Sequence, residues 1–85
     1  MSFFVYILYS KKYDTYYKGQ TQNLNQRVSR HNAGLEKSTS RYKPWILIWS
    51  TEKSTRKEAL TLERKLKNLS KERLKKFMEK YPWRS

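Results

Sequence analysis

The stretch FFVYILYSKKYDTYYKGQ, residues 3–20, holds two runs of aromatic and β-branched residues on either side of the polar break KKYD. Such runs are typical of β-strands, so we predict a hairpin with strands over residues 3–9 and 15–20. If KKYD forms a four-residue loop, Tyr17 lies opposite Leu8, and Tyr6 is one diagonal step away, at a spacing of ~7–8 Å. Two phenols then project from the same face of the sheet.

Gly19 follows Tyr17 on that face and is one of only two glycines in the chain. A glycine inside a strand packs nothing and costs backbone entropy on folding. Its missing side chain leaves room for a backbone or a ligand to approach. The alternative is that Tyr6 and Tyr17 are ordinary tyrosines of an amphipathic strand.

The remainder of the chain has a helical and then a mixed pattern. Leu24, Val28 and His31 recur at helical spacing, and Gly34 then suits a C-terminal cap. The apolar run PWILIWST, residues 44–51, is typical of a buried strand. The segment between them, residues 35–43, is expected to be a mobile basic loop.

Two further helices are expected at the C-terminal end. Thr55 and Glu58 form a capping box before a stripe of apolar residues that extends from Ala59 to Leu69. Ser70 is suited to cap a last helix, which ends before Pro82. The order ββαβαα indicates an α+β fold with a three-stranded antiparallel sheet flanked by helices.

The composition favours a polyanionic partner. The 85 residues suffice for one domain, and 20 Lys and Arg against 7 Asp and Glu give a net charge of +13. Nucleic acid is the partner that best neutralises this charge. The alternatives are a basic surface that is simply solvated, and a docking role on an acidic protein or on ribosomal RNA. The chain has no cysteine, and its N-terminal apolar run is too short to span a bilayer, so we expect a cytoplasmic protein without membrane contact.

Three polar residues fall at unusual positions. Arg27 and His31 are one helical turn apart, which suits a phosphate site, although a lone histidine there is also typical of a packed core residue. Glu63 falls within the apolar arc of its helix and therefore needs a partner. That partner is either a cation of the same helix, such as Arg56 or Lys67, or a hard divalent metal ion.

Together these residues resemble the GIY-YIG nuclease family. FVY at positions 4–6 and YKG at positions 17–19 stand in place of the two motifs that name the family. The positions that match the family are Tyr6, Tyr17, Gly19, Thr21, Arg27, His31 and Glu63.

The resemblance implies a GIY-YIG domain over residues 1–85, with its core at about residues 3–80, like the small stand-alone bacterial members. It also implies hydrolysis of a DNA phosphodiester with one divalent metal ion, Mg²⁺ or Mn²⁺. Glu63 would hold the metal, and Arg27 would hold the phosphate. Tyr6 would activate water, with its pKa lowered by Arg27, Lys18 and the metal.

Two further roles follow from the resemblance. His31 would accept or relay the proton of Tyr6, and Tyr17 would position water and phosphate, although the roles of the two tyrosines are interchangeable at this stage. By the same resemblance, Gly19 has a structural role, because it keeps the second strand open beside the catalytic phenol.

One departure from the family opens a second interpretation. Members usually carry an asparagine well after the glutamate, whereas Asn68 follows Glu63 by only five residues and does not match. The alternative to a DNA repair or recombination type of endonuclease is thus a weakly active or inactive nucleic-acid-binding module. Recognition is expected to depend on DNA structure rather than sequence, or on a protein partner.

The expected binding surface is a set of basic residues with one aromatic ring. DNA rather than RNA is the favoured ligand, and Tyr42 would stack on an unpaired base. Cations of the last two helices, such as Arg64, Lys65 and Lys76, are expected to contribute little. The predicted contacts are Lys11, Lys12, Lys18, Arg30, Lys37, Arg41, Tyr42 and Lys43.

Overall fold

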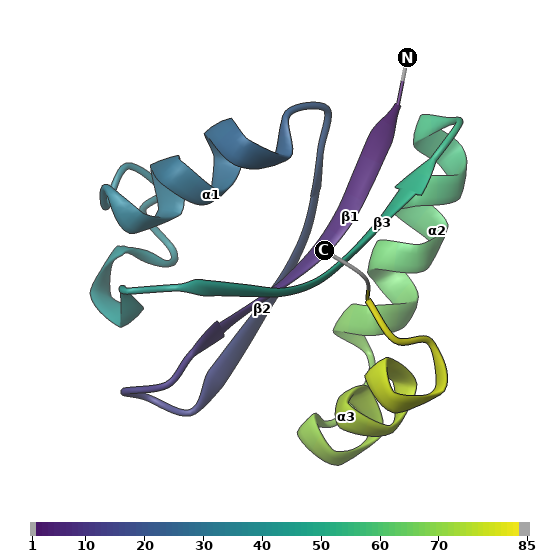
Figure 1. Ribbon diagram of the computed structural model, residues 1–85. Coiled ribbons are helices and arrows are strands. Elements are labelled where there is room, and N and C mark those ends of the chain that lie inside the picture. The colour runs from purple at the N-terminus through teal and green to yellow at the C-terminus, as the bar shows by residue number, and fades with distance from the viewer. Residues whose placement is uncertain (1, 84–85) are drawn as a thin grey trace.

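The computed structural model describes residues 2–83 and confirms the predicted order of elements. The strands form one antiparallel sheet in the order β2-β1-β3. Helix α1 covers one face of this sheet, and α2 and α3 lie on the other side (Figure 1). The elements are β1 (Phe3–Ser10), β2 (Thr15–Thr21), α1 (Leu24–Asn32), the 3₁₀ turn η1 (Ser40–Tyr42), β3 (Ile46–Lys53), α2 (Arg56–Lys67) and α3 (Lys71–Lys80).

The hairpin has the predicted register. Tyr17 pairs with Leu8, and Tyr6 pairs with Gly19, so the two tyrosines share the face of the sheet that α1 covers. The turn ends at Asp14, whose φ of 48° is tolerated by aspartate, and the Tyr9 hydroxyl donates to its carboxylate at 2.9 Å. The loop length of four residues therefore decides which side chains meet.

The helices have the caps predicted at Thr55, Ser70 and Gly34, and Asn23 adds a cap that was not predicted. The side chains of Asn23, Thr55 and Ser70 each accept a hydrogen bond from a backbone N–H three residues on, which satisfies a donor without an intrahelical partner. Gly34 follows the end of α1 with a φ of +76°, the left-handed conformation that glycine adopts without strain.

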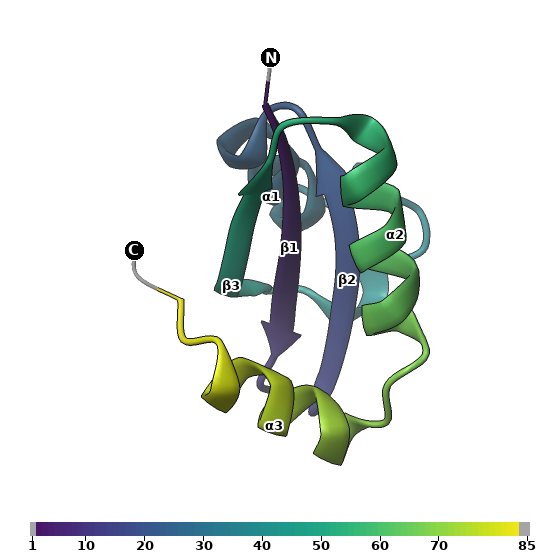
Figure 2. The same ribbon diagram turned by 90° about the vertical axis from the view of Figure 1, so that its right-hand side faces the viewer.

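Alternate residues of β1 build two different cores. Val5 and Ile7 are fully buried against Ala59 and Leu66 of α2 and Leu74 of α3, in a cluster without polar members. Figure 2 shows α2 beside β2 and α3 across the hairpin end of the sheet. The other face buries Tyr6 and Leu8 under α1, together with the aromatic residues that precede β3.

Two expectations about the middle of the chain were wrong. The apolar run after Pro44 forms an edge strand, in which only Trp49 is buried and Ile46 is 52% exposed, because no fourth strand covers it. Residues 35–43 are not a free loop, since Thr39 is buried and its carbonyl accepts the indole N–H of Trp45 at 3.0 Å. Within residues 2–83, no helix is long and apolar enough to cross a membrane.

Candidate active site and nucleic-acid interface

A chain of buried hydrogen bonds runs from the sheet through α1 to the following loop. Tyr6 is completely buried, and its hydroxyl lies 3.0 Å from Nε2 of His31. Nδ1 of His31 lies 2.7 Å from Oγ1 of Thr39, which is also buried. His31 is thus both a packed residue and a member of a polar network, which combines the two interpretations that the sequence left open.

The hydrogen bonds of Thr39 determine which nitrogen of His31 carries the proton. The single hydroxyl proton of Thr39 is donated to the carbonyl of Glu36 at 3.3 Å. Its oxygen therefore accepts from His31 Nδ1–H, and the unprotonated Nε2 accepts from the Tyr6 hydroxyl. Burial lowers the pKa of His31, and Arg27 and Arg30 add to this effect, so the ring is neutral at neutral pH.

The pKa of Tyr6 depends more on burial than on the cation beside it. Burial raises the pKa of the Tyr6 phenol well above its usual value, with a further contribution from Tyr17. Arg27 lowers it, but burial prevails. Lys18 does not contribute, because it pairs with Ile7 and therefore lies on the opposite face of the sheet, where burial and the nearby charge of Lys67 lower its own pKa. Tyr6 is therefore a protonated phenol in this arrangement.

Gly19 explains how a phenol fits against the strand. A Cβ at this position would lie 2.7 Å from the Tyr6 hydroxyl oxygen, 2.9 Å from its Cζ and 3.0 Å from Cε2 of Tyr17. The Tyr6 ring therefore lies directly over the backbone of Gly19. The space left by the missing side chain of Gly19 is therefore occupied by Tyr6 of the neighbouring strand, and not by a ligand.

Tyr17 and Arg27 border the buried network. The Tyr17 ring lies 4.8 Å from that of His31 and 6.2 Å from that of Tyr6, and it is only partly buried. Arg27 is 37% exposed and shares the carboxylate of Glu36 with Arg30, at 3.9 Å and 2.8 Å respectively. The side chain of Arg27 thus connects the inner network with the surface.

A cavity of about 630 Å³ opens between the first turn of α1, the end of β2 and helix α2. Its charged lining consists of Arg27, Arg56 and Glu63. The Glu63 side chain is only 13% exposed and pairs with Lys67 at 3.1 Å, as one of the two interpretations predicted. Since α1 supplies one arginine and α2 the glutamate, the fold joins the predicted phosphate and metal ligands in one cavity.

The composition of this cavity fits a hydrated divalent metal ion. Within residues 2–83, no three acidic or histidine side chains gather into a ready-made metal cluster, and Glu63 is the one carboxylate in the lining of this cavity. Mg²⁺ usually keeps several waters and takes one or two carboxylates together with substrate phosphates. Oxygen donors from Thr21 and from glutamine side chains line the same space as Glu63, which suits the waters of such an ion.

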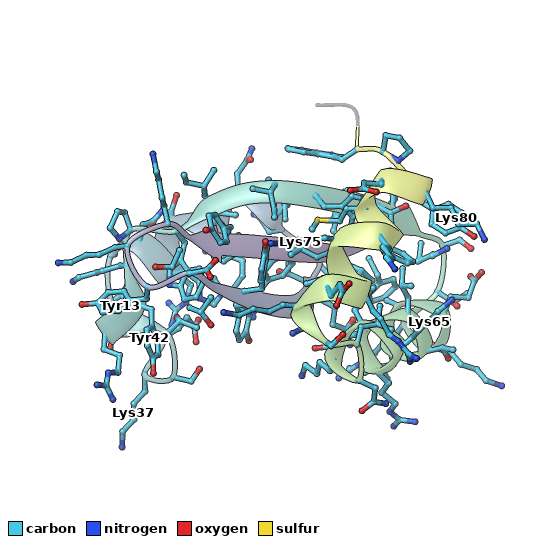
Figure 3. The ribbon with its side chains drawn as sticks, turned by 90° about the horizontal axis from the view of Figure 1, so that it is seen from below. Tyr13, Lys37, Tyr42, Lys65, Lys75 and Lys80 are labelled. Atoms are coloured by element: carbon cyan, nitrogen blue, oxygen red, sulfur yellow. The ribbon has the colours of Figure 1, made fainter. Side chains whose placement is uncertain are left out.

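The predicted nucleic-acid contacts lie apart from one another. Lys11 and Lys12 are exposed in the hairpin turn, at the end of the strands remote from the cavity. Figure 3 shows Lys37 and Tyr42 near Tyr13, and the rings of Tyr13 and Tyr42 are 5.4 Å apart. The guanidinium of Arg41 lies 5.3 Å from the centre of the Tyr42 ring, which is half-buried. Lys43 is exposed and reaches toward Gly34.

Sequence reasoning missed several residues of this region. Arg56 was expected only as a possible ion-pair partner of Glu63, whereas it lines the cavity together with Arg27 and Glu63. Glu36 is the one acid among the basic residues of its segment, and that isolation was the available signal. Thr39 lies in an irregular loop, where no periodic pattern indicates burial.

Comparison with known proteins agrees with this geometry. Residues 2–78 match the GIY-YIG catalytic domain family. A UPF0213 protein of Staphylococcus haemolyticus (strain JCSC1435) is 32% identical over 77 residues, which cover 89% of this chain and 93% of that protein. The solution NMR structure of a UPF0213 protein from Bacillus halodurans aligns with a TM-score of 0.61 and 28% identity, over 93% of this chain and 84% of the other. The chain therefore belongs to the GIY-YIG catalytic domain family, a family of nucleases.

Proposed function

We propose that this protein is a divalent-metal-dependent endonuclease that hydrolyses phosphodiester bonds of DNA. The observation that carries the proposal is the position of Arg27. Arg27 lines the same cavity as Arg56 and Glu63. His31, one turn further along α1, hydrogen-bonds to the Tyr6 hydroxyl. A phosphate held there by Arg27 and Arg56 would lie between the buried proton network and the glutamate.

The buried network is suited to move one proton. A water that attacks phosphorus loses a proton to the Tyr6 oxygen while Tyr6 passes its own proton to Nε2 of His31. The phenol then never has to exist as a free phenolate, which its raised pKa would oppose. Burial opposes the positive charge on the imidazolium that results, and the negative charge of Glu36 offsets part of this effect.

The metal ion belongs to the Glu63 side of the cavity. When bound, Mg²⁺ or Mn²⁺ would polarise the phosphoryl oxygen and neutralise charge on the leaving group. Glu63 would exchange its ion pair with Lys67 for this ligand, and Tyr17, at the border of the site, would position water and phosphate.

Recognition is proposed to depend on DNA structure, or on a protein partner, rather than on sequence. Lysine and arginine dominate the candidate contacts, and such side chains bind phosphates, which carry no sequence information. A role in DNA repair or recombination is consistent with this mode of binding.

A second candidate function is a nucleic-acid-binding module without catalysis. The observation that favours it is the burial of Tyr6, which is fully covered and does not line the cavity. Cleavage requires the side chains that cover Tyr6 to move when substrate binds, whereas simple binding does not.

A cleavage panel separates the two functions. Branched, flapped, duplex and single-stranded DNA are incubated with Mg²⁺ or Mn²⁺ and either the wild type or Glu63→Ala. We expect Glu63→Ala to abolish cutting while it leaves DNA affinity nearly unchanged, because the metal ligand is lost and the cations remain. Glu79→Ala removes an equal charge from an exposed position of α3 and serves as the control.

Two results would contradict the nuclease. If wild type and Glu63→Ala bind all substrates equally and neither cuts, the protein is a binding module. If cutting survives in Glu63→Ala, the activity belongs to another site or to a contaminant.

A further inference from the structure

The neutral part of the cavity lining has a composition that phosphate binding does not explain. The chain contains three glutamines, Gln20, Gln22 and Gln26, and all three line this one cavity. Gln20 comes from β2, Gln22 from the connection that follows and Gln26 from the first turn of α1. Residues from three neighbouring segments thus place their amides around a common space.

These amides are available to a ligand. No hydrogen bond among residues 2–83 uses the side chain of Gln20, Gln22 or Gln26. Asn23, which also lines the cavity, is occupied instead, because its side chain caps α1 through the backbone N–H of Gln26. A glutamine amide offers two donors and one acceptor, the pattern that the edge of a nucleobase matches.

The cavity also has an aromatic residue and sufficient volume. Phe3 is the only aromatic member of its lining. The space of about 630 Å³ is open to solvent on one side and falls within the size range of ligand pockets, roughly 300–1,000 Å³. A base that enters such a cavity must leave the helical stack, which is easiest for a nucleotide that is already unpaired.

We infer that the cavity contains a subsite for one unpaired nucleobase beside the scissile phosphate. Phe3 stacks on the base, the glutamine amides bind its edge, and Arg27 and Arg56 hold the adjoining phosphate. This inference rests on the proposed function and narrows its substrate to nucleic acid with an unpaired nucleotide at the cut. A continuous duplex leaves the subsite without its ligand.

The test uses a flapped DNA with a normal base or an abasic residue at the junction nucleotide. Both affinity, by fluorescence anisotropy, and metal-dependent cleavage are measured for the wild type and for Gln22→Ala/Gln26→Ala, which changes two exposed side chains. We expect the wild type to bind the normal base about tenfold more tightly, because the base stacks on Phe3 and its edge is bound by the amides, and the double variant to lose the part of this difference that the amides contribute. The salt dependence of binding should not change, because amides displace no counterions.

Asn25→Ala is the matched control, since this exposed amide lies on α1 but outside the cavity. Cleavage without any preference for the normal base would overturn the subsite and leave the nuclease intact. A base preference in binding without cleavage would overturn the nuclease and support the subsite. An equal loss of preference in Asn25→Ala would also overturn the subsite, because the effect would then not belong to the cavity.

Discussion

The two faces of β1 differ in the way they bury their side chains. On the α2 and α3 face, Val5 and Ile7 pack in a cluster of aliphatic and aromatic side chains from β3, α2 and α3. On the α1 face, Tyr6 is equally buried but hydrogen-bonds to His31, which continues to Thr39. One strand therefore faces an apolar cluster with its odd positions and, through Tyr6, a polar network on the other side, where buried polar groups are tolerated because each has a partner.

The largest effect on cleavage is expected when the hydroxyl of Tyr6 is removed from the polar face of the sheet. Tyr6→Phe interrupts proton transfer to His31, so we expect cleavage to fall by about 10²–10⁴-fold. Tyr17→Phe, on the border of the same site, should cost less. Single-turnover cleavage of a flapped DNA measures both, and a larger loss in Tyr17→Phe would exchange the roles of the two tyrosines.

A large-to-small substitution in the apolar cluster under α2 and α3 should reduce stability without a specific effect on cleavage. Leu66 is fully buried between α2 and the sheet, and Leu66→Ala should lower the free energy of unfolding by about 3 kcal/mol. Urea denaturation measures the loss. The folded fraction of the variant should cleave DNA at the wild-type rate, and a specific loss of cleavage would show that the two faces are coupled.

Substitutions at the two glycines should distinguish a steric effect on the Tyr6 side chain from strain in the backbone alone. In Gly19→Ala the new Cβ would meet the Tyr6 hydroxyl at 2.7 Å, so we expect a loss of about 1–3 kcal/mol in stability together with impaired cleavage. Gly34→Ala should cost about 1–2 kcal/mol because of its φ of +76°, with cleavage retained. Denaturation and cleavage are measured on both variants, and equal cleavage would remove the special role of Gly19.

Stability should decrease at both acid and alkaline pH because of the two titratable groups of the polar face, His31 and Tyr6. Below the ordinary His31 pKa of 6.5, the unfolded chain takes up a proton that the folded chain resists, so stability falls as pH drops through the lowered pKa. Above the ordinary Tyr6 pKa of 10.0, the unfolded chain releases a proton that the folded chain retains, so stability falls as pH rises. Urea midpoints across this range should flatten on the acid side in His31→Asn and on the alkaline side in Tyr6→Phe.

The smallest effect is expected for the surface cations, which should change the salt dependence of DNA binding. Those of residues 37–43 are compared with those of α2 and α3. If about five phosphates are neutralised, log K against log[salt] should have a slope near ~−4 to −5 on duplex DNA. Removal of Lys37, Arg41 and Lys43 should flatten the slope by roughly 2–3 units. Removal of Arg64, Lys65 and Lys76, all exposed on α2 and α3, should change it by less than one unit. An equal change in both triple variants would show that DNA binding is diffuse.

The sequence by itself determined the features that depend on neighbours in the chain. The four-residue break KKYD fixed the hairpin register and hence the common face of Tyr6 and Tyr17. Local side-chain caps at Asn23, Thr55 and Ser70 set the starts of the helices, and Gly34 the end of α1. These features were predictable because turns and caps form between residues at most a few positions apart.

Only the tertiary structure decided the partners and the protonation of the site. Thr39 meets His31 across an irregular loop, and Arg56 joins Arg27 at the cavity although 29 positions separate them in the sequence. The raised pKa of Tyr6 likewise follows from complete burial under α1, which outweighs the charge of the one arginine beside it. Desolvation depends on everything that packs around a group, and no spacing along the chain encodes that sum.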